Sequence, residues 1–411
     1  MASTDARDRL NFFFLNLGHF LDHLFTLVFA TVAALALVKE WGLSYAELVP
    51  YATPGFIAFG LFSLPAGRLA DKWSRHGMMV VFFIGIGLAS IATGFAQSPL
   101  QIGILLFFVG ILAAIYHPVG LAMVVDGAKA SGTGMAIGIN GVWGNLGVGA
   151  AALITGWFID NGGWRSAFIA PGIVSVLIGL AYWWHVRDDI RAAANRPKST
   201  GAAAISMGHL SADAKAALWK LTAVVFFTTA VSSLVFQSTT FALPKMFDER
   251  LGGIAVSATA IGWLAFIVFA VASLAQLVVG SQLDRFGPRR VFMVVAAIQV
   301  VFFAIMPGLQ DWSALAIALG FMLGAFGQIP INDYMIGKMA RSELRATIYG
   351  VRYIVSFSVL AAALPLIAYI HGNHGFDMLF RVLAGAAAVI FMAVTLLPDT
   401  IAEPEAAPIK A

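Results

Sequence analysis

The sequence predicts an all-α integral membrane protein with twelve transmembrane helices. Three observations predict this class: 60% of the 411 residues are hydrophobic, only 11% are charged, and the mean hydropathy is +0.87. A soluble domain carries roughly 25% charged and about 45–50% apolar residues. No soluble core could hide this much apolar surface from water, so the solvent for most of the chain must be lipid.

The start of the chain and its cysteine content exclude two further features. Residues 1–9 are short and polar, and the first apolar stretch is too long for the apolar region of a signal peptide. We therefore expect that stretch to remain as the first membrane helix. The chain contains no cysteine, which excludes disulfides and thiol chemistry.

The apolar stretches fall into two sets of six. A spanning helix needs about 20 mostly apolar residues. The stretches that meet this requirement are 11–38, 46–70, 77–97, 100–126, 131–159, 164–186, 218–247, 256–283, 288–308, 312–338, 343–370 and 377–397. We therefore expect an N-terminal six-helix bundle at 1–186, a polar cytoplasmic linker at 187–217 and a C-terminal six-helix bundle at 218–411.

The positive charges predict which side of the membrane each loop faces. If both termini and the linker are cytoplasmic, 19 of the 25 Lys and Arg residues fall on the cytoplasmic side. Arg352 lies within a predicted span, and five residues fall outside: Lys39, Arg165, Lys245, Arg250 and Arg381. Cytoplasmic loops carry an excess of Lys and Arg, so we expect cytoplasmic termini.

The two sets of helices are related by an internal repeat. Gly67 in GRLADKWSRH and Gly280 in GSQLDRFGPRR are 213 residues apart, and Pro118 and Pro330 are 212 apart. Trp164 and Phe376, each opening the last helix of its set, are also 212 apart. A constant offset at three places indicates a duplicated six-helix unit, as in many transporters.

The segment GRLADKWSRH at 67–76, with its weaker copy at 280–290, resembles the signature of the major facilitator superfamily. The resemblance implies a transporter with two pseudo-symmetric six-helix bundles that works by alternating access. It also assigns a gating role to Gly67, Asp71, Arg75, Asp284 and Arg285. By this resemblance Asp71 caps the helix that begins near Ser342-Glu343, although an acidic residue there can also pair with a nearby Arg.

Three segments resemble a narrower branch of that superfamily, the fosmidomycin-resistance type of drug exporter. They are HFLDH at 19–23, YHP at 116–118 and GNLG at 144–147. The branch tends to have Asn-Asp where this chain has Asp22-His23, and an acidic residue where it has Val119. Both departures fall at polar sites in membrane helices, which leaves substrate and coupling open.

The first helix carries the densest group of ionisable residues. His19, Asp22 and His23 are spaced by three and four residues and share one helical face. Ionisable groups within a membrane span are costly and mark functional sites, and histidine titrates near neutral pH. We therefore expect these three residues to couple transport to protons, with an interhelical hydrogen bond of Asp22 as the alternative. The grouping could also ligate a metal, but no dense Met, Cys or Glu cluster supports one, and we assign no metal site.

Other polar and aromatic residues within the spans are candidate substrate ligands. His117 precedes Pro118, Gln237 stands out from a polar stripe on the seventh helix, and Arg352 needs a partner because it is always charged. Asp333 is either that partner or a separate ligand. The complete set of expected substrate ligands is His117, Asn140, Trp143, Gln237, Gln328, Asn332, Asp333, Arg352 and Tyr353.

Two functions compete. The first is a proton-coupled antiporter in the cell inner membrane that expels an amphipathic small molecule or drug. The second is an importer or exchanger of a small organic anion held by Arg352. The sequence shows no nucleophile–base pair, phosphate-binding loop or nucleic-acid-binding pattern, so we expect neither an enzyme nor a cofactor. The expected partners are a small-molecule substrate, protons and lipid, and the chain is expected to act as a monomer.

Overall fold

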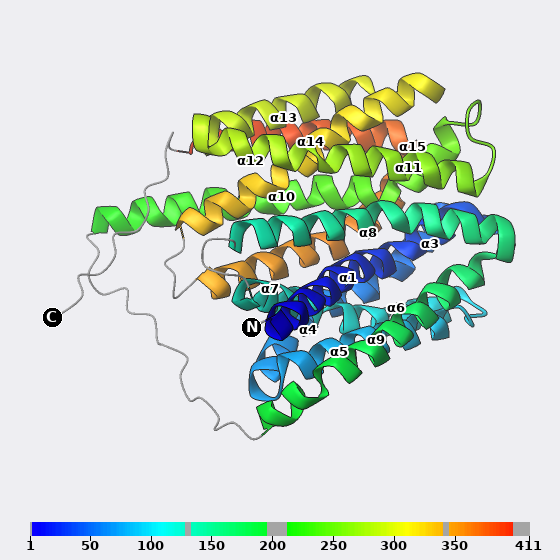
Figure 1. Ribbon diagram of the computed structural model, residues 1–411. Helices are drawn as coiled ribbons and strands as arrows, with labels where there is room; N and C mark the ends of the chain where they lie inside the picture. Colours follow the sequence, from blue (N-terminus) through cyan, green and yellow to red (C-terminus); the bar gives the residue numbers. More distant parts are fainter. Residues whose placement is uncertain (1, 128–132, 195–211, 340–344, 398–411) are drawn as a thin grey trace.

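The computed structural model describes residues 2–127, 133–194, 212–339 and 345–397 (Figure 1). Within these ranges all regular structure is helical, and no strand occurs in them. Eleven helical stretches of the described chain are long and apolar enough to cross a membrane. The predicted all-α membrane fold is confirmed.

The last of these stretches contains two spans. Ile354–Val394 has 41 residues, a length of about 60 Å, which is twice the roughly 30 Å of a bilayer's hydrocarbon core. Gly375 breaks the stretch with a φ of 70°, a conformation that glycine adopts without steric cost. The break falls between the predicted eleventh and twelfth helices, so the described part of the chain contains the expected twelve spans.

The first group of helices runs from α1 to α9 and includes two π-helical turns, η1 and η3, and one 3-10 turn, η2. Its members are α1 (Ala2–Val32), η1 (Ala33–Leu37), α2 (Val38–Glu40), α3 (Tyr45–Leu48), η2 (Val49–Ala52), α4 (Thr53–Lys72), α5 (Arg75–Thr93), α6 (Pro99–Ala113), η3 (Tyr116–Gly120), α7 (Leu121–Gly127), α8 (Thr133–Gly162) and α9 (Trp164–Ala194).

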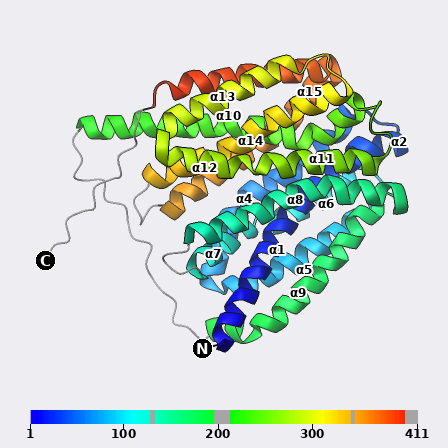
Figure 2. The same ribbon diagram turned by 45° about the horizontal axis from the view of Figure 1, so that its top comes forward.

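The second group of helices runs from α10 to α15. Its members are α10 (Ala212–Arg250), α11 (Ala258–Ser273), α12 (Ala275–Phe286), α13 (Pro288–Ile305), α14 (Asp311–Met339) and α15 (Arg345–Val394). Figures 1 and 2 show the two groups side by side, with α8 lying along α11.

Helical structure enters both ends of the segment expected to be a linker. α9 continues to Ala194 and α10 begins at Ala212, whereas the linker was expected at 187–217. The residues from Arg187 to Ala194 include three alanines and two arginines, which are good helix formers. An ion pair between Arg191 and Asp188, 3.5 Å apart and one helical turn from each other, adds to this extension. The boundaries of the two bundles stay a prediction.

Close helix packing joins the two groups through α8 and α11. A Cβ at Gly156 would lie 2.2 Å from the carbonyl oxygen of Ala258, and one at Gly262 would lie 2.6 Å from that of Ala152. Only glycine allows the two backbones to approach this closely. By contrast, a Cβ at Gly141, nearer the start of α8, would meet no described atom within 4 Å. A Cβ at Gly149, in the middle of α8, would still meet the side chain of Phe266 at 3.1 Å, so the described contact runs at least from Gly149 to Gly156.

A carboxylate of α8 binds the first turn of α11 at the end of this contact. Asp160, near the end of α8, accepts hydrogen bonds from the backbone N–H of Thr259 at 2.7 Å and of Ala258 at 3.3 Å. The hydroxyl of Thr259 donates to the same carboxylate at 2.6 Å. These N–H groups belong to the first turn of α11, where a negative charge is favoured by unpaired donors and the helix dipole. Asp160 therefore connects the two groups on the side opposite the start of α1.

The outer surface of the described helices is apolar. Large exposed side chains occur on both groups, among them Leu61, Leu100, Trp184, Leu277 and Val294. Apolar side chains exposed around every face of a helical protein are expected when lipid replaces water as the solvent. This agrees with the lipid contact inferred from composition.

We predict that replacing Asp160 with Ala weakens the contact between α8 and α11 on the side opposite the start of α1. Loss of a helix cap costs about 0.5–2 kcal/mol, which corresponds to a roughly 2- to 30-fold shift in the conformational equilibrium. Because the chain has no natural cysteine, an Ala265→Cys substitution can report this shift. Ala265 is buried on the face of α11 shared by Gly262 and Phe269.

The measurement is the rate at which a membrane-impermeant maleimide labels the introduced cysteine from the side opposite the chain start. Asp311→Ala serves as the control, since Asp311 accepts from Gly253 N–H within the second group. Equal labelling rates in the Asp160 and Asp311 variants would contradict the prediction.

Candidate functional site

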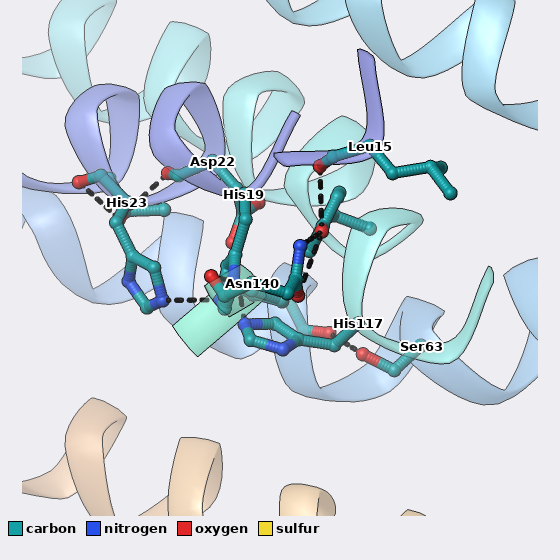
Figure 3. A network of polar contacts seen from close by, with 10 residues as sticks. Leu15, His19, Asp22, His23, Ser63, His117 and Asn140 are labelled. Carbon is teal, nitrogen blue, oxygen red and sulfur yellow. Dashed lines mark hydrogen bonds and ion pairs between the residues drawn. The ribbon is translucent and has the colours of Figure 1, made fainter. Parts of the chain in front are cut away.

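His19, Asp22 and His23, in the middle of α1, face the interior of the first group of helices. Asp22 is completely buried, whereas His19 and His23 are half-buried. His23 Nε2 lies 3.2 Å from His19 Nε2 one helical turn away (Figure 3). The shared face that the spacing predicted is therefore present.

A π-helical turn brings two more side chains to this face. Pro118 has no N–H to donate, so it interrupts the regular hydrogen-bond ladder, and π turns of this kind often occur at functional sites. Within the turn, η3, the hydroxyl of Tyr116 donates to the backbone carbonyl of Leu15 at 2.8 Å. His117 places Nε2 3.4 Å from the Asp22 carboxylate, and its side chain is 10% exposed.

Asn140 on α8 is the centre of a buried polar network. Its side-chain amide donates to Asn16 at 3.0 Å and to the Tyr116 hydroxyl at 2.8 Å, and its backbone carbonyl lies 2.7 Å from His19 Nδ1. A carbonyl accepts only, so His19 must carry its proton on Nδ1 and keep a lone pair on Nε2. His23 then donates to that lone pair. Three elements, α1, η3 and α8, are thus joined by one residue.

Glycines of α8 make room for this network. A Cβ at Gly144 would lie 2.6 Å from the ring of His19, and one at Gly147 would lie 2.2 Å from the carbonyl oxygen of Phe20. The ring of His19 stacks on that of Tyr116 with centroids 4.9 Å apart. The segment GNLG at 144–147 therefore has a packing role: it lets α1 and α8 meet closely enough to hold the imidazole.

An aromatic contact joins this site to the second group. Phe59 on α4 stacks on Phe357 of α15 with ring centroids 3.9 Å apart, and both rings are buried. The ring of His117 lies 5.8 Å from that of Phe59 and 5.9 Å from that of Phe357. A residue of the first group and a residue of the second group therefore flank the same imidazole.

The second group contains its own ionic pair. Arg352 on α15 donates to the carboxylate of Asp333 on α14, and the Arg352 side chain is only 12% exposed. The pairing considered from the sequence is therefore present. Asp333 is more accessible, at 42% exposed, which leaves its carboxylate within reach of water.

The other expected ligands of the second group differ in their surroundings. Gln328 is buried, donates to the backbone carbonyl of Ser232 at 2.9 Å and accepts from Gln299 at 3.1 Å. Asn332 is buried beside the hydroxyl of Thr229 at 3.5 Å. In this conformation both amides connect helices of the second group, and their contact with a substrate stays a prediction.

The remaining expected ligands are Gln237, Trp143 and Tyr353. Gln237 on α10 is half-buried. Trp143 on α8 packs edge-on against Phe13 with ring centroids 5.8 Å apart. The side chain of Tyr353 lies outside the described residues. Their role in substrate binding stays a prediction.

The expected gating residues lie where α4 and α12 end. Arg75 pairs with Asp71 at 3.0 Å and also with Asp126, and all three side chains are at least 39% exposed. This is the Arg partner considered for Asp71, whereas the helix start near Ser342-Glu343 lies outside the described residues.

The other gating candidates show close packing or exposure. A Cβ on Gly67 would lie 3.4 Å from Cβ of Pro118, so α4 and η3 are in contact there. Asp284 and Arg285 are exposed, and the guanidinium of Arg285 lies over the ring of Phe286. The gating role of all five residues stays a prediction.

Sequence reasoning missed some residues of the site. Asn16 lies three residues before His19 and seven before His23, a spacing that could have placed it on the same helical face. Phe59 and Phe357 could not be singled out among 33 phenylalanines. Their contact depends on how the two groups meet.

Comparison with known proteins identifies the family. The chain matches the Major Facilitator Superfamily over residues 15–253 and 225–410. It belongs to that superfamily. The chain is therefore a polytopic membrane transporter of the secondary type and not an enzyme, as the sequence predicted.

Relatives and solved structures agree with membership of the Major Facilitator Superfamily. The chain is 27% identical to the "Gallate transporter" of Pseudomonas putida, with 87% of this chain and 85% of the relative covered. It is 26% identical to the "Probable 4-methylmuconolactone transporter" of Cupriavidus pinatubonensis, with 89% and 85% covered. The "Multidrug resistance protein MdtG" of Yersinia enterocolitica is 25% identical over 63% of this chain and 60% of its own length.

A crystal structure of a peptide transporter POT mutant in complex with sulfate has the same fold. The TM-score is 0.72 at 14% identity, with 93% of each chain covered. The first two relatives are named for small organic compounds, and the narrower fosmidomycin-resistance branch stays a prediction.

We predict that Asn140→Ala destabilises the first group of helices. The substitution removes the side-chain amide that donates to Asn16 and to the Tyr116 hydroxyl, while the backbone carbonyl that holds His19 remains. Loss of a buried partner of this kind costs about 1–3 kcal/mol. The midpoint of thermal unfolding in detergent should fall clearly below that of Asn161→Ala. Asn161 is an exposed residue of α8 that bonds only to its own helix. An unchanged midpoint would instead indicate that Asn140 is kept for substrate binding.

Proposed function

We propose that this chain is a proton-coupled transporter that takes up a small organic acid. The observation that carries the proposal is Arg352, a permanently charged side chain of α15 that is 12% exposed and lies within the span expected at 343–370. Such a charge in a membrane helix is costly and marks a substrate or ion pathway. A guanidinium also matches the geometry of a carboxylate, to which it can donate two parallel hydrogen bonds.

The pairing with Asp333 is consistent with this role. In the absence of a substrate, a buried cation needs a counter-charge. A substrate carboxylate can take over that function from the more exposed Asp333. The gallate transporter to which the chain is similar bears the name of an aromatic carboxylate, which supports an organic acid as the substrate class.

Separate sites for the anion and the proton favour movement of both in the same direction. Arg352 and Asp333 lie on α15 and α14, whereas Asp22 and His117 lie on α1 and η3. A proton shared between Asp22 and His117 therefore does not occupy the groups that bind the anion. Both sites can be filled at once, as symport requires, whereas antiport is simplest when proton and substrate compete for one group.

Alternating access follows from the way in which the two groups meet. The described contacts of α8 with α11 close the side opposite the start of α1, and the stacked rings of Phe59 and Phe357 close the centre. Opening that side requires the Asp160 contacts to break while the gating segment at 67–76 closes the other side. Rocking of two repeats about a central site is a common transporter mechanism.

Efflux of a drug or other amphipathic molecule is the second candidate. It is supported by the similarity to a multidrug resistance protein and by the resemblance of HFLDH, YHP and GNLG to drug exporters. The location in the cell inner membrane, the cytoplasmic termini and the monomeric state form part of the same proposal.

We predict that Arg352→Ala abolishes saturable uptake of organic anions. Proteoliposomes would be supplied with a panel of radiolabelled aromatic and aliphatic carboxylates, including gallate. Arg352→Lys should retain part of the activity with a KM raised at least about tenfold, because a point charge replaces the two-pronged donor.

Arg381→Ala is the control, since it removes an exposed arginine from the neighbouring span that follows Gly375. Full carboxylate uptake by Arg352→Ala would contradict the anion-binding role. If the chain transports lipophilic cations but no carboxylates, and Arg352→Ala does not change this transport, the efflux function would be favoured.

We predict that Asp22→Asn uncouples transport from protons. An amide cannot take up or release the proton, so an inward proton gradient should no longer drive accumulation of the acid. Exchange of labelled for unlabelled acid at equal pH should continue, because it needs no net proton movement. The rate of exchange and the gradient-driven accumulation would be measured in the same proteoliposomes.

Asp71→Asn, which changes an exposed carboxylate away from this site, is the control. The compared quantity is the gradient-driven accumulation divided by the rate of exchange, which Asp71→Asn should leave unchanged. If Asp22→Asn still accumulates substrate when the outside is acidic, Asp22 does not carry the coupled proton.

A further inference from the structure

Three imidazoles from two elements converge beside Asp22. His19 and His23 lie on α1 and His117 lies on η3 (Figure 3). One ring nitrogen from each residue lies within 4.8 Å of the others. From the sequence, only His19 and His23 could be grouped, and the third ring is added by the π turn.

The spacing of the nitrogens suits a divalent metal. Histidine nitrogens bind Zn²⁺ at about 2.0–2.1 Å, which places two ligands of a tetrahedral site roughly 3.3 Å apart. His19 Nε2 and His23 Nε2 are separated by 3.2 Å. The third nitrogen lies within 4.8 Å of the other two, so its separation from each must shorten by up to about 1.5 Å to complete a three-histidine site.

The orientation of His19 also suits a metal ligand. Its Nδ1 lies 2.7 Å from the backbone carbonyl of Asn140, so the proton is on Nδ1 and the lone pair of Nε2 points towards His23. When the ion binds, the proton that His23 Nε2 donates in the metal-free site moves to His23 Nδ1, so that both Nε2 atoms offer lone pairs. Metal-binding histidines generally donate their other N–H to a carbonyl or carboxylate, which fixes the tautomer and the ring orientation. The Asn140 network provides this support before any metal arrives.

A carboxylate lies next to the three rings. Oδ2 of Asp22 is 3.4 Å from His117 Nε2, and the Asp22 side chain has no exposed surface. A carboxylate beside a divalent ion offsets its charge and is itself a frequent zinc ligand. Three imidazoles and one carboxylate make up a four-ligand set without cysteine, which zinc, nickel and copper ions accept.

We propose that His19, His23 and His117 form a binding site for a divalent transition-metal ion such as Zn²⁺, with Asp22 as the neighbouring anion. All four residues belong to the first group of helices, so the ion fixes α1 to η3 and does not bridge the two groups. An ion at this place keeps His117 away from Asp22. Inhibition of transport by the bound ion follows if the proposed proton coupling through Asp22 and His117 holds, and the binding itself does not depend on it.

The experiment is a calorimetric titration of the full-length protein, purified in detergent without a histidine tag, with Zn²⁺ alone. We expect one saturable site per chain. His19→Gln, His23→Gln and His117→Gln should each weaken the affinity at least tenfold. His374→Gln, which changes an exposed histidine of α15, should bind Zn²⁺ as the unmodified chain does.

A second measurement uses only the unmodified protein and therefore does not depend on whether the histidine variants fold. Co²⁺ bound to the unmodified protein should give the visible absorption bands of a four-coordinate site with nitrogen and oxygen ligands, and Zn²⁺ should displace it. No saturable binding, an affinity unchanged in all three histidine variants, or a six-coordinate Co²⁺ spectrum would overturn the proposal. Binding is measured without an organic acid, so it succeeds or fails independently of the proposed transport function.

Discussion

The absence of water in the bilayer core is the constraint on which the rest of this structure depends. Each backbone N–H and C=O in that region must be satisfied within its own helix, because lipid offers no partner. Polar side chains then have to find partners on neighbouring helices. In the first group of helices this leads to the junction at Asn140, where α1, η3 and α8 share hydrogen bonds. The placement of His19, His23 and His117 follows from that junction.

The sequence predicts the fold well because a helix that spans lipid must be apolar along its length, and hydropathy measures this property directly. The twelve spans follow from runs of apolar residues, and even the break at Gly375 falls between two predicted helices. The shared face of His19 and His23 follows from helical periodicity, which is a local property. The extension of α9 to Ala194 was not predicted, because the polar segment from residue 187 was expected to be a linker, whereas its alanines and arginines have high helix propensity.

The candidate site could be predicted only in part, because it depends on contacts between distant segments. Asn140 was expected to bind substrate, and its bonds to Asn16 and Tyr116 could not be derived before α1 and α8 were placed together. The π turn at Pro118 turns His117 towards Asp22, a detail of hydrogen bonding that hydropathy does not encode. The pair of Arg352 and Asp333 could be considered in advance, because an arginine is always charged and needs a counter-charge within a membrane helix.

The contact at Asp160 has a consequence for how such a transporter can evolve. The acceptor is one carboxylate, but the main donors are backbone N–H groups of α11, which are present whatever side chains that helix carries. Mutation can therefore vary the strength of this contact at a single position. The pair proposed to bind the substrate, Arg352 and Asp333, lies elsewhere, on α15 and α14. The resting orientation of the transporter, and with it the step that limits its turnover, can be adjusted without any change in what it recognises.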